Sequence, residues 1–319
     1  MSLSRSLSSL KKTINLIVEP DHPRLKYKPR DWQTKLNIKH WGQRKLLLSE
    51  ILFLTRWGHL SNMVVYAGAA PGNHLHYLSE LFPEHKFILI DPNPFQIVGS
   101  EKIEIINDYF TNEIAKRFVD SKVLFISDIR TADHRQMSQK ENEEYIIKDN
   151  NSQIAWVNLM KPAKSMLKFR CPYPNIIDQP TLMFKGIVFL QIWPPPSSTE
   201  TRLIVDDSFD IIEYDNLIYE EQLFYHNSVT RYKKYPQPIK GEGLDDSYDA
   251  CAEVLILYEF LEKFPIYKGK DVYKTISEMS YNISRAITKS GRTLAISMKN
   301  PEHRRNFPQI DHTVFYEII

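Results

Sequence analysis

The sequence predicts an α/β fold built on a mostly parallel sheet. Short apolar strands alternate with helical stretches through residues 41–193, which is the pattern of strand–helix–strand units. A second observation concerns the strand ends, because three of them carry Gly68, Asp91 and Asp128. Ligands of open parallel sheets bind beyond the carboxyl ends of the strands. The fold class therefore predicts a site at that edge.

Apolar spacing and stop signals define the first elements. Residues 41–57, "WGQRKLLLSEILFLTRW", have apolar side chains at helical spacing, and residues 63–68, "MVVYAG", read as a buried strand that ends in glycine. A helix over 73–82 is stopped by Pro83, since proline cannot continue a helix. The segment "KFILID" (86–91) is a second strand, and it ends in an acid.

The same pattern continues along the chain. Short apolar runs predict strands over 102–107 and 122–128, and a long polar stretch predicts a helix from about 139 to 160. Two further strands are expected over 165–170 and 186–193. The remaining expected elements are a strand that follows the proline-rich loop, within 194–205, and helices over 246–264 and 270–288.

The chain is nearly neutral as a whole, but its charge is uneven. The net charge is +2 over 319 residues, yet residues 1–45 carry 11 basic and 3 acidic side chains, so the remainder is net acidic. A basic segment on such a body indicates a polyanionic partner. A solubilising tail would have the same composition, and the sequence alone leaves both interpretations open.

The first 18 residues form a second feature of this end. They are rich in serine, contain arginine and lysine but no acid, and place Leu3, Leu7, Leu10, Ile14 and Ile17 at helical spacing. A transit peptide has a similar composition. The apolar period favours a packed or frayed N-terminal helix.

Cysteine usage and hydropathy exclude several classes. The chain has two cysteines, Cys171 and Cys251, and no CxxC pattern, which argues against a disulfide scaffold or a structural zinc site and fits a reducing compartment. No apolar run approaches the roughly 18 residues of a membrane span. We therefore expect neither a metal site nor a membrane partner.

The segment "VVYAGAAPGNHLHYL" reads as strand, glycine turn and helix. Gly68 lets the backbone turn, Gly72 lets a ligand approach the start of the helix, and Asp91 follows about 20 residues after the first glycine, where a carboxylate can bind ribose hydroxyls. The stretch lacks the G-x-G-x-x-G cradle for a pyrophosphate. A nucleoside without phosphates fits better, and S-adenosylmethionine is the common one. An ordinary strand–turn–helix joint is the alternative.

Four charged residues stand out: Lys45 early in a helix, Asp128 at a strand end, Lys168 inside an apolar strand and Glu200 before the strand "TRLIV". Singly, such a lysine extends its head to water and such a carboxylate caps a strand. Together they fit methyl transfer to a ribose hydroxyl, because burial and a second ammonium lower a lysine pKa toward about 7–8. We expect Lys168 as the base, Lys45 as a cationic neighbour that polarises the 2′-oxygen, and the carboxylates as orienting groups.

The ordered motifs carry a resemblance to a known family. The segments "GQRKLLLSEILFL", "VVYAGAAPGNHLHYL", "ILID", "LFISDIR", "SMLKFRCPYP", "TETRL" and "YEEQLFYHN" resemble the poxvirus cap-specific mRNA 2′-O-methyltransferases, which are also regulatory subunits of poly(A) polymerase. The resemblance runs from about residue 25 to 230. It implies a Rossmann-like, S-adenosylmethionine-dependent methyltransferase fold, with a mostly parallel central sheet flanked by helices.

The resemblance also implies roles for individual residues. The family's Lys-Asp-Lys-Glu tetrad falls on Lys45, Asp128, Lys168 and Glu200. Its contacts with S-adenosylmethionine fall on Gln43, Tyr66, Gly68, Gly72, Asp91 and Phe110, and the family's arginine two residues past the strand-two acid is Asn93 here.

A cap pocket is implied as well. In the family, N7-methylguanine stacks between two aromatic rings, and a cationic base gains a cation–π contribution of roughly 0.5–2 kcal/mol from such stacking. The matching positions are Tyr173, Tyr27 and Glu220. The second family carboxylate is Asn175 here, so either cap selectivity is relaxed or a different acid contributes.

Charge, the predicted helices and strands, and the resemblance together give the expected organisation. Residues 1–40 form a basic N-terminal arm and 41–288 a single methyltransferase domain, with a cofactor half over about 41–130 and an RNA and cap half over about 160–288. Residues 289–319 form a C-terminal tail. The resemblance implies capped mRNA and the poly(A) polymerase catalytic subunit as partners, and a place in the host cytoplasm or virion if the chain is viral, or the cytoplasm otherwise.

Other functions compete with this one. A non-catalytic RNA-binding processivity subunit of a poly(A) polymerase is the main alternative, and both roles can reside in one chain. The missing G-x-G-x-x-G argues against a nicotinamide-dependent oxidoreductase. The chain has "DPNP" and "CPYP" but no Asn/Asp-Pro-Pro-Tyr turn, which favours a hydroxyl acceptor over an amine.

Overall fold

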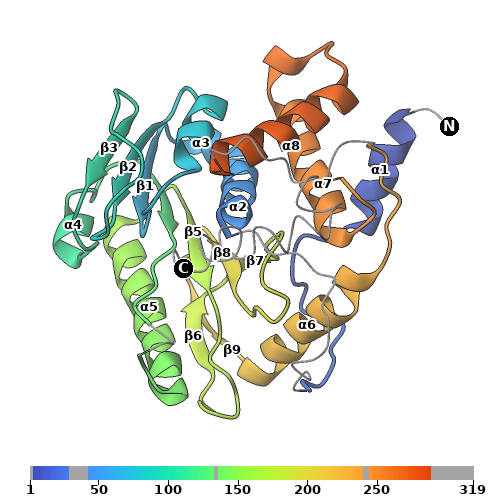
Figure 1. Cartoon of the computed structure of the whole chain (residues 1–319). Coiled ribbons are helices and arrows are strands. Elements are labelled where there is room, and N and C mark those ends of the chain that lie inside the picture. The colour runs from blue at the N-terminus through green and yellow to red at the C-terminus, as the bar shows by residue number, and fades with distance from the viewer. Residues whose placement is uncertain (1–2, 29–41, 133–135, 240–243, 289–319) are drawn as a thin grey trace.

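The computed structural model describes residues 3–28, 42–132, 136–239 and 244–288. Its centre is a seven-stranded sheet in the order β3-β2-β1-β4-β5-β8-β7 (Figure 1). The first five strands of this order run parallel, and β8 is antiparallel to both of its neighbours. The bounds are β1 Met63–Ala67, β2 Lys86–Ile90, β3 Ile103–Ile106, β4 Leu124–Ser127, β5 Lys164–Phe169, β7 Gly186–Phe189 and β8 Thr201–Val205. The predicted Rossmann-like α/β fold is confirmed.

Helices cover both faces of this sheet. The helices are α1 Leu3–Thr13, α2 Gly42–Trp57, α3 Leu75–Leu81, α4 Asn112–Lys116, α5 Gln139–Met160, α6 Asn216–Ser228, α7 Tyr248–Lys263 and α8 Val272–Thr288, with 3-10 turns over Gly58–Leu60, Thr230–Tyr232 and Pro265–Tyr267. One core cluster joins α1, α2, α3, α7 and α8 to the sheet. A second joins α4, α5 and α6 to the other face.

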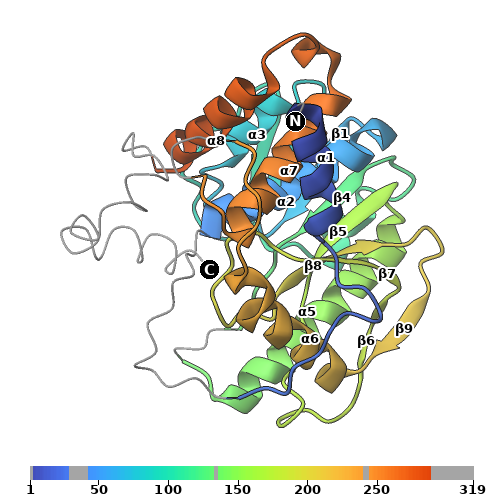
Figure 2. The same cartoon turned by 90° about the vertical axis from the view of Figure 1, so that its right-hand side faces the viewer.

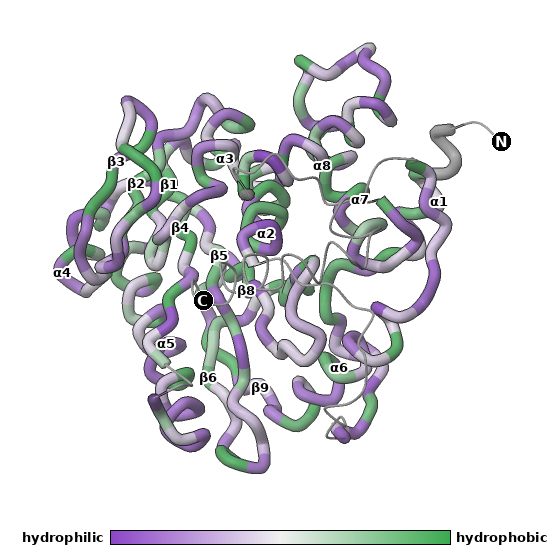
Figure 3. Tube along the Cα trace, viewed as in Figure 1, coloured by the Kyte–Doolittle hydropathy of each residue, from purple (hydrophilic) through white to green (hydrophobic). Residues whose placement is uncertain are grey.

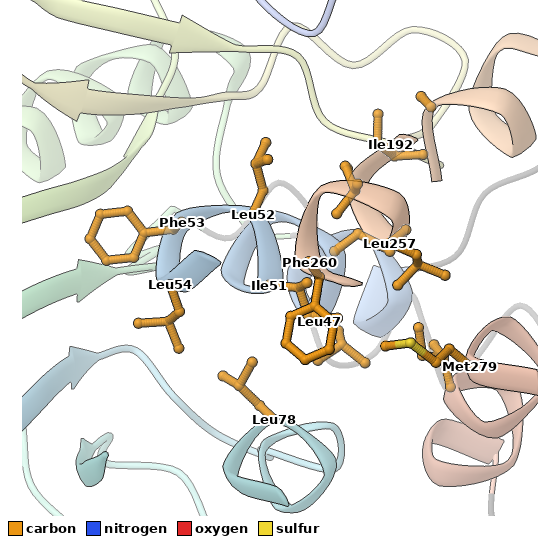
Figure 4. Close-up of a cluster of buried hydrophobic side chains, with 14 of the residues drawn as sticks. Leu47, Ile51, Leu52, Phe53, Leu54, Leu78, Ile192, Leu257, Phe260 and Met279 are labelled. Carbon is orange, nitrogen blue, oxygen red and sulfur yellow. The ribbon is translucent and has the colours of Figure 1, made fainter. Parts of the chain in front are cut away.

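The helix α2 is apolar on more than one side because it lies between the sheet and other helices. Leu47 and Ile51 are fully buried, and Figure 4 shows them close to Leu257 and Phe260 of α7 and to Met279 of α8. A helix that is surrounded in this way needs apolar residues around most of its circumference. Figure 3 shows the contrast with α5, much of which is hydrophilic, whereas β2 and β3 are hydrophobic.

The N-terminal residues pack along the body of the protein. Leu7 and Leu10 of α1 are buried in the same cluster as α7, and Figure 2 shows α1, α2 and α7 side by side. Beyond α1 the chain runs beside β7, where Val18 N donates to Val188 O at 2.8 Å and Leu190 N to Leu16 O at 2.9 Å. The predicted packed N-terminal helix is confirmed. Residues 29–40 of the expected arm lie outside the described residues, as does the expected tail over 289–319.

The sequence analysis missed two strands and a helix and predicted one strand as too long. The prediction had no strands at β6 (Thr181–Phe184) and β9 (Ile211–Tyr214), which form a separate two-stranded sheet, and no helix at α6. The strand expected over 186–193 ends at Phe189, because the chain then turns and Trp193 adopts a left-handed φ of 63°. None of the described helices combines the length and apolar character that crossing a membrane requires.

Candidate active site

The four charged residues singled out in the sequence meet in one cluster. Lys45 Nζ lies 2.8 Å from Glu200 Oε1, and Lys168 Nζ lies 3.1 Å from Asp128 Oδ1 and 3.5 Å from Glu200 Oε2. The sheet explains this meeting, because β4 and β5 pair in parallel with Ser127 opposite Leu167. Asp128 and Lys168 each follow one residue later. Thus two residues 40 positions apart become neighbours at the sheet edge.

Burial and charge set the protonation behaviour of this cluster. Lys45 is 3% exposed, and burial lowers its pKa to about 8, despite the attraction of Glu200. Burial alone would raise the pKa of Glu200, but the nearby cations, Lys168 first, hold that pKa well below its usual range. Arg202 and Lys168 likewise outweigh burial and lower the pKa of Asp128. Both carboxylates are therefore ionised at neutral pH.

Two arginines of the cluster were missed in the sequence. Arg202 Nη2 donates to Asp128 Oδ1 at 2.7 Å, and Arg130 Nη2 donates to Glu200 Oε2 at 2.8 Å. Arg202 lies on β8 directly opposite Lys168 in the antiparallel register. The signal that could have found it is the spacing of Glu200 and Arg202, because residues two apart in a strand share a face.

The C-terminal helices brace the helix that carries Lys45. The neighbouring residue, Arg44, is buried and donates through Nε to Glu253 Oε2 of α7 at 2.7 Å and through Nη1 to Ser284 Oγ of α8 at 3.0 Å. Trp193 Nε1 donates to the same Glu253 oxygen at 2.8 Å. Helices α7 and α8 thus fix the position of α2 relative to the sheet.

The glycine turn after β1 packs against the strand-end acids. Gly68 has φ +79°, and a Cβ there would come within 2.8 Å of the backbone carbonyl carbon of Asp128, so only glycine fits. Gly72 has φ +72°. Asp91 Oδ2 accepts from Ala70 N at 3.1 Å and its Oδ1 accepts from Asn93 N at 2.8 Å, which ties the turn to the end of β2.

The other expected cofactor contacts lie close to this turn. Gln43 Oε1 is 2.7 Å from His74 Nδ1, and Tyr66 Oη donates to Glu50 Oε1 at 2.7 Å; His74 Nε2 lies 3.0 Å from the same Glu50 oxygen. Burial and Glu50 raise the pKa of Tyr66 well above its usual value. Sequence reasoning missed His74 and Glu50, which join the two predicted residues into one buried network.

Phe110 and Asn93 complete the expected cofactor set. The ring of Phe110 lies 4.8 Å from that of Trp156 and 5.3 Å from that of Phe125, between centroids, so much of it belongs to the core. Asn93 Nδ2 donates to Asp91 Oδ1 at 3.0 Å. The amide that replaces the expected arginine therefore bonds to the strand-end acid.

A cavity of about 450 Å³ opens beside the charged cluster. Lys168 and Glu200 line it at the cluster, and Arg170 and Tyr173 line it further along the chain after β5. A second wall is a face of α5 with mostly polar side chains, namely Gln139, Asn142, Glu143, Ile146, Asp149, Asn150 and Gln153. Residues after β4 and before β8 complete the lining, namely Ile129, Arg130, Ala132, Pro195, Ser197, Ser198 and Thr199. The cavity therefore connects a group of reactive side chains with a predicted aromatic binding residue.

The expected cap residues are only partly gathered here. Tyr173 lines the cavity, whereas Tyr27, Asn175 and Glu220 are not among the described residues that do so. Tyr27 is exposed and its ring packs edge-on against Phe224 at 5.2 Å, and Asn175 is exposed. Glu220 is close enough to Arg170 for the arginine to lower its pKa, although burial, the largest effect, raises the pKa overall.

Potential metal-binding side chains do not gather into a site in the described part of the chain. Within it, no group of three or more histidine, cysteine, aspartate or glutamate side chains is arranged to hold a metal ion. Cys171 and Cys251 are both buried free thiols.

Comparisons with known proteins agree with the resemblance in the sequence. A family model described as "Poly A polymerase regulatory subunit" matches residues 15–295. A cap-specific mRNA (nucleoside-2′-O-)-methyltransferase of Myxoma virus (strain Lausanne) is 32% identical over 229 residues, covering 65% of this chain and 67% of that protein. One of the same name from Fowlpox virus (strain NVSL) is 30% identical over 267 residues, covering 73% and 80%.

A solved structure of a putative ribosomal RNA methyltransferase from Plasmodium falciparum has a TM-score of 0.32 and 10% identity, and the match covers 50% of this chain and 94% of that one. That level of likeness adds nothing to the fold seen directly.

Proposed function

Because this chain belongs to the poly(A) polymerase regulatory subunit family, we propose that it methylates the ribose 2′-hydroxyl of a cap-proximal nucleotide in N7-methylguanosine-capped mRNA. The single observation that carries the proposal is the meeting of Lys45, Asp128, Lys168 and Glu200 beside a cavity. Two of its relatives with at least 30% identity have names that state this reaction.

S-adenosylmethionine is the methyl donor in this proposal, and it supplies a methyl carbon made electrophilic by a sulfonium. The glycine turn beside Asp128 is followed by a hydrogen-bond acceptor that lacks a partner within the described part of the chain. Asn73 follows Gly72, is 8% exposed, and its Oδ1 is buried without a hydrogen-bond partner among the described residues. An ammonium such as that of a methionine moiety would satisfy this acceptor. The contacts expected for this donor are Gln43, Tyr66, Gly68, Gly72, Asp91, Asn93 and Phe110.

Lys168 is the general base of the proposal, because it lines the cavity while Lys45 does not. In its neutral form, Lys168 Nζ would take the hydroxyl proton while the 2′-oxygen gains the methyl group and the bond between that carbon and the donor sulfur breaks. Asp128 and Glu200 hold that nitrogen on two sides and stabilise the ammonium that forms. Lys45 contacts the same Glu200 carboxylate and polarises the site as a buried cation.

The test is a labelled-methyl assay on capped and uncapped short RNAs, with nuclease mapping of the modified ribose. Lys168→Ala should abolish transfer while binding of S-adenosylhomocysteine persists. Lys164→Ala is the matched control, since Lys164 lies on the same strand, has the same 11% exposure and pairs with one carboxylate, Asp207, at 2.7 Å. Transfer that survives in the Lys168 variant contradicts the assignment of the base.

A second role is favoured by the family description itself. We propose that the chain also binds RNA for a poly(A) polymerase catalytic subunit, with exposed basic side chains near the N-terminus, such as Lys11, Lys26 and Lys28, contacting phosphates in a salt-dependent manner. The length of poly(A) tracts made by that subunit, with and without this chain, measures the role. Lys168→Ala should keep it, because the base takes no part in processivity.

A further inference from the structure

Arg170 covers one face of the Tyr173 ring, on which the proposed function expects the cap base to stack. Its guanidinium carbon lies 4.2 Å from the centroid of the Tyr173 ring, and both side chains line the cavity. Such a distance is that of a cation–π contact. An aromatic ring in a binding cavity thus already carries a cation in the free protein.

A buried carboxylate holds this cation in place. Glu143 of α5 has a side-chain exposure of 3%, and its two oxygens each lie 2.7 Å from Arg170 Nη2. The same carboxylate accepts from Tyr173 N at 2.9 Å. Any group that replaced the guanidinium over the ring would therefore present its edge to Glu143.

The backbone of the segment that carries Arg170 and Tyr173 is held by α5, so a rearrangement here involves side chains. Gln153 Nε2 donates to Lys168 O at 2.9 Å and Asn150 Nδ2 donates to Arg170 O at 3.1 Å, both from α5. Together with the bond from Tyr173 N, these tie the segment to one face of the helix. A ligand that stacks on the same face of Tyr173 as Arg170 has to displace the guanidinium.

The arginine is also incompletely satisfied where it lies. Arg170 Nε is buried and has no hydrogen-bond partner among the described residues. A buried donor without a partner costs free energy, which the side chain recovers by swinging toward water. Its 22% exposure leaves a route to the solvent.

The chemistry of the ring's expected occupant matches that of the guanidinium. N7-methylguanine is planar and cationic, and its N1–H and N2–H₂ groups around C2 repeat the donor pattern of a guanidinium. A base stacked in place of Arg170 would donate to Glu143 and keep that buried carboxylate paired. A neutral guanine would leave it uncompensated, which is costly.

Resting on the proposed function, we propose that Arg170 is an internal stand-in for the methylated cap base. It is stacked on Tyr173 and bonded to Glu143 in the free protein, and the cationic base displaces it on binding. Glu143 is then a specificity-determining residue, and it supplies the carboxylate that the exposed Asn175 lacks. Glu220 adds a second negative charge near the same arginine.

The experiment measures binding of N7-methylguanosine and of guanosine, without phosphates, so that a displaced Arg170 gains nothing from binding phosphate. Arg170→Met should bind N7-methylguanosine about two- to tenfold more tightly than the unaltered protein, since no internal cation competes. Glu143→Gln should lose the preference for the methylated nucleoside. Equal or weaker binding by Arg170→Met overturns the proposal.

A matched control and a direct readout complete the design. Arg56 lies over Phe189 at 5.2 Å and pairs with Glu259, so Arg56→Met removes an equivalent contact and should leave binding unchanged. In the unaltered protein, the side-chain protons of Arg170 should lose their ring-current shift when N7-methylguanosine is added. Persistence of that shift in the bound state contradicts displacement, even if Glu143→Gln fails to fold.

The outcomes separate this inference from the proposed function. If the protein methylates capped RNA but Arg170→Met binds N7-methylguanosine no more tightly than the unaltered protein, the proposed function holds and the displacement of Arg170 is wrong. If Arg170→Met binds N7-methylguanosine more tightly and Glu143→Gln loses its preference for it, but no methyl transfer is detected, the displacement of Arg170 holds and the proposed function is wrong.

Discussion

The two ends of the cavity are held together in different ways. At the charged cluster, the single carboxylate of Glu200 contacts three cations, Lys45, Lys168 and Arg130, which come from three different segments. At the other end, Arg170 is the cation that lies on Tyr173, and its Nε has no hydrogen-bond partner among the described residues. The comparison indicates that the reacting end is organised in advance, as electrostatic catalysis requires. The recognition end exchanges one partner for another.

The largest expected effect breaks the reacting end at its centre. Glu200→Gln leaves Lys45, Lys168 and Arg130 without their shared charge, so we expect a loss of about 3–5 kcal/mol in unfolding free energy, together with loss of methyl transfer. Urea-induced unfolding measures the first and the labelled-methyl assay the second.

The control for this change is an exposed pair. Glu104 lies 2.8 Å from Lys86, and the side chains are 42% and 48% exposed, so Glu104→Gln should cost less than about 1 kcal/mol. If the two variants lost similar stability, the cluster at Glu200 would not be the tightly coupled network described above.

The buried lysine predicts a second effect, on the pH dependence of stability. Burial lowers the pKa of Lys45 to about 8 in the folded protein, from 10.5 for a free lysine. Between these pH values the unfolded chain binds a proton that the folded chain does not, so unfolding free energy rises with pH. Relative to Lys45→Met, the unaltered protein should gain on the order of 3 kcal/mol between pH 7.5 and 10.5. Parallel stability curves for the two proteins would contradict this.

Arg202 sharpens the comparison on the catalytic side. It lies opposite Lys168 and donates to Asp128 at 2.7 Å. It therefore positions Asp128, and Asp128 in turn positions Lys168, the proposed base. Arg202→Met should lower kcat by about 10- to 100-fold, through misplacement, with the KM for capped RNA and the affinity for S-adenosylhomocysteine nearly unchanged. The exposed Arg117→Met is the control. A change confined to KM would instead assign Arg202 to substrate binding.

The sequence allowed the reacting end to be predicted for a physical reason. Asp128 and Glu200 flank strands, and Lys168 interrupts an apolar one, so each stands out from its local pattern. Arg202 was missed because its meaning depends on the antiparallel register of β5 and β8, which no local pattern specifies. Most strands of the central sheet were predicted because burial on both faces makes them short apolar runs, and α2 was predicted because burial gives it an apolar helical spacing.

The recognition end was harder to predict, and Glu143 shows why. It lies on α5, a largely polar helix whose sequence does not reveal which face meets the sheet. Only the packing of α5 against β5 brings its carboxylate to Arg170 and Tyr173. The short strands β6 and β9 escaped for a similar reason, since exposed apolar residues such as Leu182 and Ile211 blur the alternation.

The smallest expected effect concerns Asn175, an exposed residue with an amide where the family has a carboxylate. Asn175→Asp restores a negative charge two residues after Tyr173, near the surface. Water and salt screen such a charge, so it should contribute about 0.3 kcal/mol, or less than about twofold in affinity for N7-methylguanosine, and the gain should shrink at high salt. Asn282→Asp, an exposed change on α8, is the control and should have no effect. A gain as large as that of Arg170→Met would mean that charge at the rim, rather than exchange over the ring, decides which base is bound.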